Sequence, residues 1–127
     1  LITPVLQNAD NTSLSDLSLQ WADLVKRARN KQLEPQEYSS GTFTLSNLGM
    51  FGVDRFDAIL PPGTGAILAV GASLPKVVAS KDGSISIKKQ MQVNLTADHR
   101  VIYGADGALF LKDLAYLIEN NPYSLSS

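Results

Sequence analysis

The residues of this 127-residue chain with the clearest chemical potential lie in one stretch near its C-terminal end, residues 94–104. This stretch contains the only histidine of the chain, His99, which stands between Asp98 and Arg100. The chain has no cysteine, so the imidazole of His99 is the one side chain expected to exchange a proton readily near neutral pH. His99 is therefore the first candidate for a general base, although a histidine at a strand end also serves as a structural hydrogen-bonding residue.

Ser46 is the second polar residue whose position suggests chemistry. It ends an alternating segment rich in β-forming residues, 42–46, and precedes a loop punctuated by glycines, 47–53. A serine there can act as a nucleophile, as a hydrogen-bond donor to an oxyanion, or as a cap of the strand end. The surrounding residues lack the Gly-x-Ser-x-Gly elbow of many serine hydrolases, which leaves that function weakly supported. As an oxyanion donor, one hydroxyl lowers a barrier by about 2.7–4 kcal/mol.

Asp98 and Arg100 flank the histidine directly. Neighbouring residues on a strand point to opposite faces, so Asp98 is not expected to orient the ring of His99 through a side-chain bond. We expect Asp98 to pair with a basic or backbone group instead, and Arg100 to have a similar structural role.

The composition excludes several classes of function. Apolar residues make up 44% and charged residues 18%, so the chain can bury a core. Eleven basic and twelve acidic residues give a net charge of −1 without a basic block, which argues against nucleic-acid binding or an anionic membrane surface. No apolar run reaches the roughly 20 residues that span a bilayer. With one histidine and no cysteine, neither disulfides nor a conventional zinc site are expected.

The elements that must position these residues follow from the hydrophobic pattern, which predicts a mixed α/β fold and not an all-parallel doubly wound sheet. Strand 91–96 delivers Asp98 and His99 at its end, and a helix follows over 104–120. Its expected inner face is Ala108, Leu111, Leu114, Ala115 and Ile118. The other expected elements are an extended segment 1–6, a helix capped by Ser13 with Asp16, strand 42–46, a buried strand 66–71, and a hairpin of 77–79 with 85–87 around Asp82-Gly83.

Two motifs of the chain resemble a known family. Residues 97–106, Ala-Asp-His-Arg-Val-Ile-Tyr-Gly-Ala-Asp, are similar to the D-H-R-x-x-D-G signature of the acyltransferase (E2) components of 2-oxo acid dehydrogenase complexes. Residues 43–49, Phe-Thr-Leu-Ser-Asn-Leu-Gly, match their second hallmark, F-T-[IL]-S-[SN]-L-G. The resemblance covers essentially residues 1–127. The run 49–63 is most similar to the plastid and cyanobacterial pyruvate dehydrogenase type.

The resemblance implies a chloramphenicol-acetyltransferase-like fold that forms trimers, with a channel between subunits that coenzyme A and a lipoyl arm enter from opposite ends. It assigns His99 as the general base that takes the proton of the attacking thiol. It assigns Ser46 as the oxyanion donor, supplied by a different subunit. Asn47, Asp98, Arg100 and Tyr103 are the supporting residues and no metal is involved. Tyr103 stands where the family has an acid or asparagine, four residues after the histidine.

The resemblance also implies an extent and a setting. The chain corresponds to the C-terminal half of the catalytic domain, residues 1–127, without lipoyl or peripheral-subunit-binding domains, and it begins at Leu1 as if cut from a longer protein. The implied activity is acetyl transfer between dihydrolipoamide and coenzyme A in a homotrimer that meets lipoyl domains and the E1 and E3 components. The alternative is a non-catalytic scaffold of the same complex. The implied location is the plastid stroma, or alternatively a cyanobacterial cytoplasm. Tail residues 123–127 are either an anchor to a neighbouring trimer or a frayed terminus.

Overall fold

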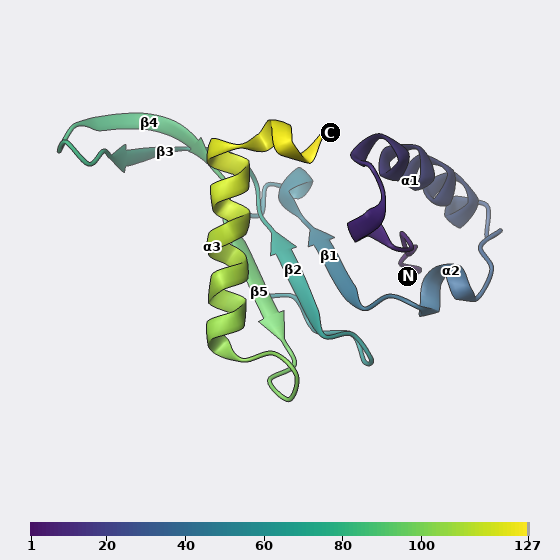
Figure 1. Cartoon of the computed structure of the whole chain (residues 1–127). Helices are drawn as coiled ribbons and strands as arrows, with labels where there is room; N and C mark the ends of the chain where they lie inside the picture. The colour runs from purple at the N-terminus through teal and green to yellow at the C-terminus, as the bar shows by residue number, and fades with distance from the viewer. Residues whose placement is uncertain (127) are drawn as a thin grey trace. The chain divides into compact units, whose positions relative to one another are not determined.

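The computed structural model describes residues 1–126, which form two compact units (Figure 1). One unit is Thr42–Gly107, which we call the sheet unit, and it contains both candidate motifs up to the start of the last helix. The other unit comprises Leu1–Gly41 together with the described chain from Ala108 onward, and we call it the helical unit. Helices and strands are both present, so the predicted mixed α/β class is confirmed.

The sheet unit is built on three strands in the order β1 (Phe43–Asn47), β2 (Ala66–Val70) and β5 (Val93–Ala97). Strand β1 runs parallel to β2, whereas β5 runs antiparallel to it. The central strand β2 is the continuous apolar run of the sequence, and burial on both faces is what such a run predicts. This prediction is confirmed, because four consecutive residues of β2 are buried: Ala66, Ile67, Leu68 and Ala69.

The predicted hairpin is also confirmed. Strands β3 (Leu74–Ala79) and β4 (Ile85–Gln90) pair antiparallel as a separate two-stranded sheet, which Figure 1 shows extending away from the three main strands. Gly83 adopts a φ of 85° in the connecting turn, a conformation that glycine reaches without the steric cost of a Cβ atom. The strands are longer than the sequence pattern indicated, because the pairing continues to Leu74 and Gln90.

Hydrogen bonds hold the segment between β1 and β2 against the neighbouring strands. A short 3₁₀ turn, η2 (Gly49–Phe51), follows β1, and the segment 53–57 then passes the ends of the neighbouring strands. Gly71 lies so close to this segment that a Cβ atom there would stand 2.0 Å from the carbonyl oxygen of Asp54. Three hydrogen bonds fix the segment: Ala72 N to Val53 O at 2.8 Å, Lys76 Nζ to Asp54 Oδ1 at 2.8 Å, and Asn94 Nδ2 to Asp57 Oδ1 at 2.8 Å.

In the helical unit, helix α1 (Leu14–Arg29) begins as the sequence predicts. Ser13 is its N-cap, and the Ser13 hydroxyl accepts a hydrogen bond from the backbone N–H of Asp16 at 3.2 Å. The 3₁₀ turn η1 (Ala9–Asn11) precedes α1 in the chain, and the short helix α2 (Gln36–Ser39) follows α1. The expected extended segment 1–6 forms no strand; its Val5 N–H donates to the carbonyl of Glu37 at 2.8 Å.

Helix α3 (Gly104–Asn120) starts in the sheet unit and ends before the 3₁₀ turn η3 (Pro122–Leu125). Ser127 of the tail lies outside the described residues. The predicted inner face was partly wrong: Leu111 and Leu114 are half-buried, but Ala108, Ala115 and Ile118 are exposed, and Leu117 is half-buried instead. Neither α3 nor any other helix of residues 1–126 combines the length and the apolar character that a membrane crossing requires.

Helices α1 and α2 are joined by an ion pair between Arg27 and Glu37. Both terminal guanidinium nitrogens of Arg27 donate to the carboxylate of Glu37, Nη1 to Oε2 at 2.7 Å and Nη2 to Oε1 at 2.6 Å. The backbone N–H of Glu34 also donates to Glu37 at 2.8 Å. The Arg27 hydrogen bonds, followed by the Glu34 N–H, lower the pKa of Glu37 from 4.5 to about 2. The same pair raises the pKa of Arg27 further above its ordinary value.

This pair predicts a specific dependence of stability on pH. A carboxyl whose pKa is depressed by folding stabilises the folded state above its unfolded pKa, and this contribution is lost as the pH falls toward the folded pKa. Glu37→Gln is therefore expected to lower the melting temperature at pH 7, with the difference from the unaltered protein shrinking between about pH 4.5 and 2. Thermal melts across that range measure it. Glu119→Gln, at an exposed position of α3, is the matched control; a deficit independent of pH would contradict the assignment.

Candidate active site

Ser46 is the penultimate residue of β1, and strand pairing places it in a row with two residues of other strands. It lies opposite Ala69 of β2, which in turn lies opposite Asn94 of β5. Side chains directly opposite each other project from the same face of a sheet. The neighbouring row, Leu45 with Leu68 and Leu95, therefore projects from the other face. Gly107, also in the sheet unit, lies on that other face, because a Cβ atom there would stand 3.3 Å from Leu95 Cδ2. Ser46 thus projects, half-buried, from the face opposite Leu95 and Gly107.

Asn47 shapes the turn that follows Ser46. Its side-chain Oδ1 accepts a hydrogen bond from the backbone N–H of Gly49 at 2.8 Å, and the Leu48 N–H donates to the carbonyl of Val70 at 3.2 Å. A Cβ atom at Gly49 would stand 2.8 Å from the carbonyl oxygen of Gly71, so only glycine allows this close approach. The side chain of Asn47 consequently orders the loop beside Ser46, which is a supporting role.

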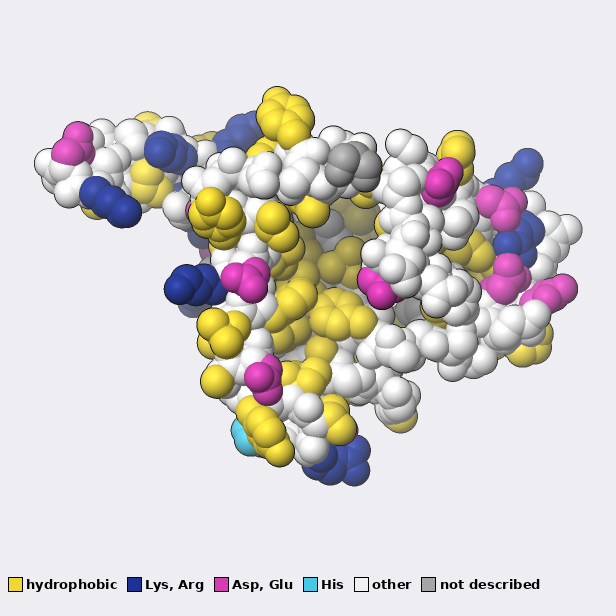
Figure 2. All heavy atoms as spheres, in the orientation of Figure 1, with side chains coloured by type: hydrophobic (Ala, Val, Ile, Leu, Met, Phe, Trp, Pro, Cys, Tyr) yellow, Lys and Arg dark blue, Asp and Glu magenta, His cyan; other side chains and the backbone are white. Residues whose placement is uncertain are grey.

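His99 lies just beyond the end of β5, in a turn that closes on Asp98. The backbone N–H groups of Val101 and Ile102 both donate to the carbonyl of Asp98, at 3.0 and 2.9 Å. The N–H of Asp98 donates to the carbonyl of Gly65 at 2.8 Å, which ties this turn to the start of β2. The imidazole itself is exposed, and Figure 2 shows the histidine in cyan at the surface beside hydrophobic side chains. The imidazole of His99 is therefore accessible to solvent in one copy of the chain.

Asp98 pairs with Arg100 and not with the histidine. Arg100 Nη2 donates to Asp98 Oδ2 at 2.7 Å, and both Nε and the backbone N–H of Arg100 donate to Oδ1 at 3.0 Å. These hydrogen bonds, the side-chain ones foremost, lower the pKa of Asp98 to about 2. The carboxylate is 21% exposed and the guanidinium 88%. The sequence-based expectation that Asp98 pairs with a basic and a backbone group agrees with this geometry, and the pair stiffens the turn that carries His99.

Tyr103 lies against His99 and immediately precedes helix α3. The two rings meet edge to face, with centroids 5.9 Å apart and planes at 62°. The backbone N–H of Tyr103 donates to Oδ2 of Asp106 at 3.2 Å, so an acid in the first turn of α3 satisfies a donor that the helix leaves open. Sequence reasoning missed this role of Asp106. The sequence signal for this role is the acidic residue Asp106, three positions after Tyr103, which immediately precedes the helix.

The structure does not bring Ser46 and His99 together within one chain. Ser46 is near the C-terminal end of β1, and His99 follows the C-terminal end of β5, which runs the opposite way (Figure 1). Ser46 and Ala97 are separated by three residues along the strands and by two inter-strand spacings. These steps correspond to about 14 Å between their backbones. Two groups that act on one carbonyl must each lie within about 3 Å of the reacting atoms, so Ser46 and His99 of one copy are too far apart to do this together.

A family model described as 2-oxoacid dehydrogenases acyltransferase (catalytic domain) matches residues 1–126. The chain is 73% identical over 120 residues to dihydrolipoyllysine-residue acetyltransferase component 5 of the pyruvate dehydrogenase complex, chloroplastic, from Arabidopsis thaliana. It is 68% identical over 126 residues to component 4 from the same plant. These matches cover 94% and 99% of this chain but 26% of each relative.

Solved structures share the fold. A dihydrolipoamide acetyltransferase of Azotobacter vinelandii, studied for the catalytic roles of one serine, one histidine and one asparagine, superposes with a TM-score of 0.86 at 33% identity. A structure described as the cubic core of the pyruvate dehydrogenase multienzyme complex gives the same values. Each match covers 94% of this chain and 49% of the other, so the chain spans about half of these structures. The implied fold, that of E2 catalytic cores, is confirmed.

The spacing of the three residues studied in the Azotobacter enzyme is informative. Its histidine and asparagine are four positions apart, and its serine precedes the histidine by 52 positions. In this chain Tyr103 follows His99 by four positions, and Ser46 precedes His99 by 53. This chain thus has a serine and a histidine at nearly the spacing found in the Azotobacter enzyme, and a tyrosine at the spacing of its asparagine.

Proposed function

Because the chain belongs to the family of 2-oxoacid dehydrogenase acyltransferase catalytic domains, we propose that the protein containing it transfers an acetyl group between dihydrolipoamide and coenzyme A. It does so as the E2 core of a pyruvate dehydrogenase complex, the complex for which both Arabidopsis relatives are named. The observation that carries this proposal is the placement of His99 and Ser46 at opposite ends of one sheet. Each can reach a substrate only together with the other residue from a second copy.

In the proposed mechanism His99 is the general base. Its imidazole takes the proton of the coenzyme A thiol, and the resulting thiolate attacks the carbonyl carbon of acetyl-dihydrolipoamide. The Ser46 hydroxyl of another copy donates a hydrogen bond to the oxygen that becomes negative as the new carbon–sulfur bond forms. The bond from carbon to the dihydrolipoamide sulfur then breaks, and the imidazolium returns its proton to that sulfur. Because both partners are thiols, no acyl-enzyme is needed.

Four further residues support this mechanism without touching the reacting atoms: Tyr103, Asp98, Arg100 and Asn47. The ring of Tyr103 packs edge-on against His99 and limits the directions the imidazole can adopt. The Asp98–Arg100 pair fixes the turn that carries the base, and Asn47 orders the loop beside the oxyanion donor. Edge-to-face packing by Tyr103 thus takes over part of the positioning that an asparagine or acid performs through polar contacts.

The proposed setting follows the same relatives. The protein forms a homotrimer that assembles further into a core, receives acetyl groups on lipoyl domains, and cooperates with the E1 and E3 components. The chain is the C-terminal half of that catalytic domain. The chloroplastic naming of both Arabidopsis relatives supports a location in the plastid stroma.

The test is complementation between two inactive variants. Full-length Ser46→Ala and His99→Ala carrying different tags are co-expressed, and mixed assemblies are purified through both tags. A site is intact when its histidine comes from a Ser46→Ala copy and its serine from a His99→Ala copy, so random mixing restores about a quarter of the sites. Acetyl transfer from acetyl-CoA to dihydrolipoamide should return to about that fraction of the unaltered activity.

The controls separate the alternatives. Each variant expressed alone, and the two mixed after assembly, should stay inactive. If mixed assemblies remain as inactive as either variant, the two residues do not act across copies. If the unaltered full-length protein transfers no acetyl group, the scaffold function replaces the catalytic one.

A further inference from the structure

Asp106 is an acidic residue in the first turn of α3, and we propose that it is a positioning residue for the general base His99, acting through Tyr103. Its carboxylate holds the backbone of Tyr103, and the ring of Tyr103 packs against the imidazole. All three residues belong to the sheet unit. This inference rests on the proposed function, because it requires that the imidazole of His99 takes the proton of a thiol.

Tyr103 occupies the position immediately before α3, where a side-chain oxygen commonly accepts a hydrogen bond from the first N–H groups of a helix. Serine, threonine, aspartate and asparagine have such an oxygen close to the backbone, whereas the tyrosine hydroxyl lies at the far end of a rigid ring. The ring of Tyr103 lies against His99 instead, with the two ring centroids 5.9 Å apart. The side chain of Tyr103 therefore contacts the imidazole and leaves the start of the helix to be fixed by another residue.

Asp106 is that other residue. Its Oδ2 accepts a hydrogen bond from the backbone N–H of Tyr103 at 3.2 Å, and the N–H of Gly107 donates to the carbonyl of Tyr103 at 3.1 Å. Both backbone polar groups of Tyr103 are thus bound by the first turn of α3. The positive end of the helix dipole also favours a carboxylate in this turn. These interactions fix the point from which the tyrosine ring extends.

Burial contributes little to holding the ring. Tyr103 is 63% exposed, so the direction of its side chain depends mainly on its backbone and on the contact with His99. The other end of the turn that carries His99 is held separately, because the N–H groups of Val101 and Ile102 donate to the carbonyl of Asp98. Loss of the carboxylate on α3 therefore loosens the Tyr103 end of the turn, and the imidazole departs from the geometry that proton transfer requires.

The experiment measures kcat and KM for acetyl transfer by the full-length protein carrying Asp106→Ala or Asp106→Asn, per amount of assembled protein. Asp106→Ala should lower kcat roughly tenfold with little change in KM, because a displaced base slows the chemical step and not substrate binding. Asp106→Asn should recover most of this loss, since the amide oxygen can accept the same hydrogen bond without the charge. An unchanged kcat in Asp106→Ala overturns the inference.

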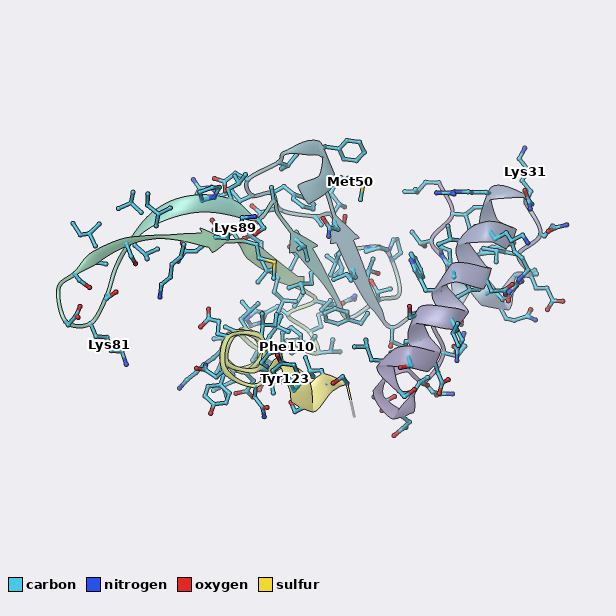
Figure 3. The ribbon with its side chains drawn as sticks, turned by 90° about the horizontal axis from the view of Figure 1, so that it is seen from above. Lys31, Met50, Lys81, Lys89, Phe110 and Tyr123 are labelled. Atoms are coloured by element: carbon cyan, nitrogen blue, oxygen red, sulfur yellow. The ribbon has the colours of Figure 1, made fainter. Side chains whose placement is uncertain are left out.

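Asp113 provides the matched control on the same helix. Figure 3, which looks along α3 beside the labelled Phe110, shows side chains with oxygen atoms reaching outward from this helix. Asp106 and Asp113 are both exposed and seven positions apart, close to two helical turns, so they lie on the same side of α3. Asp113→Ala removes the same charge and should leave kcat unchanged. An equal loss in both variants would assign the effect to charge and contradict the positioning role.

A double-mutant comparison tests whether Asp106 acts through the ring of Tyr103. In the Tyr103→Ala background the ring is absent, so adding Asp106→Ala should lower kcat no further. In the Tyr103→Phe background, which keeps the ring, Asp106→Ala should still lower kcat roughly tenfold. A full further loss on top of Tyr103→Ala overturns the inference, because Asp106 then acts by another route.

Failure of this inference and failure of the proposed function give different results. If His99→Ala retains the kcat of the unaltered protein, His99 is not the base, and the proposed function and this inference both fail. If His99→Ala loses kcat while Asp106→Ala does not, the base assignment stands and only the positioning role of Asp106 is wrong.

Discussion

His99→Ala in the full-length protein is expected to lower kcat for acetyl transfer by about 10²–10⁴-fold, the range that a positioned general base supplies. The thiol of coenzyme A is a poor nucleophile until it loses its proton, and among residues 1–126 His99 offers the only imidazole to accept it. The side chain is exposed and its one ring contact is with Tyr103, so its removal should cost little stability. Stopped-flow or steady-state assays with saturating substrates measure kcat.

The matched control for this variant is Val101→Ala, two positions further on and also exposed. It should retain the chemical step in assembled protein, because its backbone hydrogen bond to Asp98 does not involve the side chain. Melting curves of His99→Ala should coincide with those of the unaltered protein. A kcat that stays within a few-fold of the unaltered value would remove the base assignment.

Ser46→Ala is expected to lower kcat by about 10²–10³-fold, corresponding to about 2.7–4 kcal/mol of lost stabilisation of the oxyanion. The reason is that negative charge develops on the acetyl oxygen only as the thiolate attacks, so the hydroxyl acts on the transition state and KM should change little. Thr44→Ala is the control, because Thr44 lies two residues before Ser46 and projects from the same face of β1. It should leave kcat near its original value.

The same serine distinguishes two mechanisms. An oxyanion donor has no base beside it in its own chain, since His99 lies at the other end of the sheet. A fluorophosphonate probe, which labels activated serines, should therefore not react with Ser46. Labelling that depends on Ser46 would favour a serine nucleophile and contradict the role of oxyanion donor.

Local features of the fold follow from short stretches of sequence. The N-cap at Ser13, the buried run 66–70 and the Asp82-Gly83 hairpin turn depend on residues near one another in the chain, and the structure contains all three. For segment 1–6 the sequence predicts a short strand or an extended segment; it forms no strand, because a strand requires a partner edge, and no pattern in the sequence supplies one. The inner face of α3 was displaced by one position, from Ile118 to Leu117, because several apolar residues occupy adjacent faces of that helix.

The candidate site was only half predictable. His99 and Ser46 stand out by residue type and position, and the resemblance to a family supplied their roles. That they lie at opposite ends of the sheet depends on β5 running antiparallel to β2, and strand direction is not written in the local pattern around either residue. The hydrogen bond that the Tyr103 N–H donates to Asp106 Oδ2 is not predictable from the apolar pattern of helix 104–120, because that pattern does not show which group satisfies the first donors of the helix.

If Ser46 and His99 act across copies as proposed, the opposed directions of β1 and β5 set how many working sites an assembly can hold. A closed ring of copies completes every half-site, whereas an open row always leaves one serine side and one histidine side without a counterpart. An isolated copy has no complete site, and two copies joined once have a single one. On this proposal, catalytic output per chain is a measure of ring closure, and we expect it to fall on dilution before any copy unfolds.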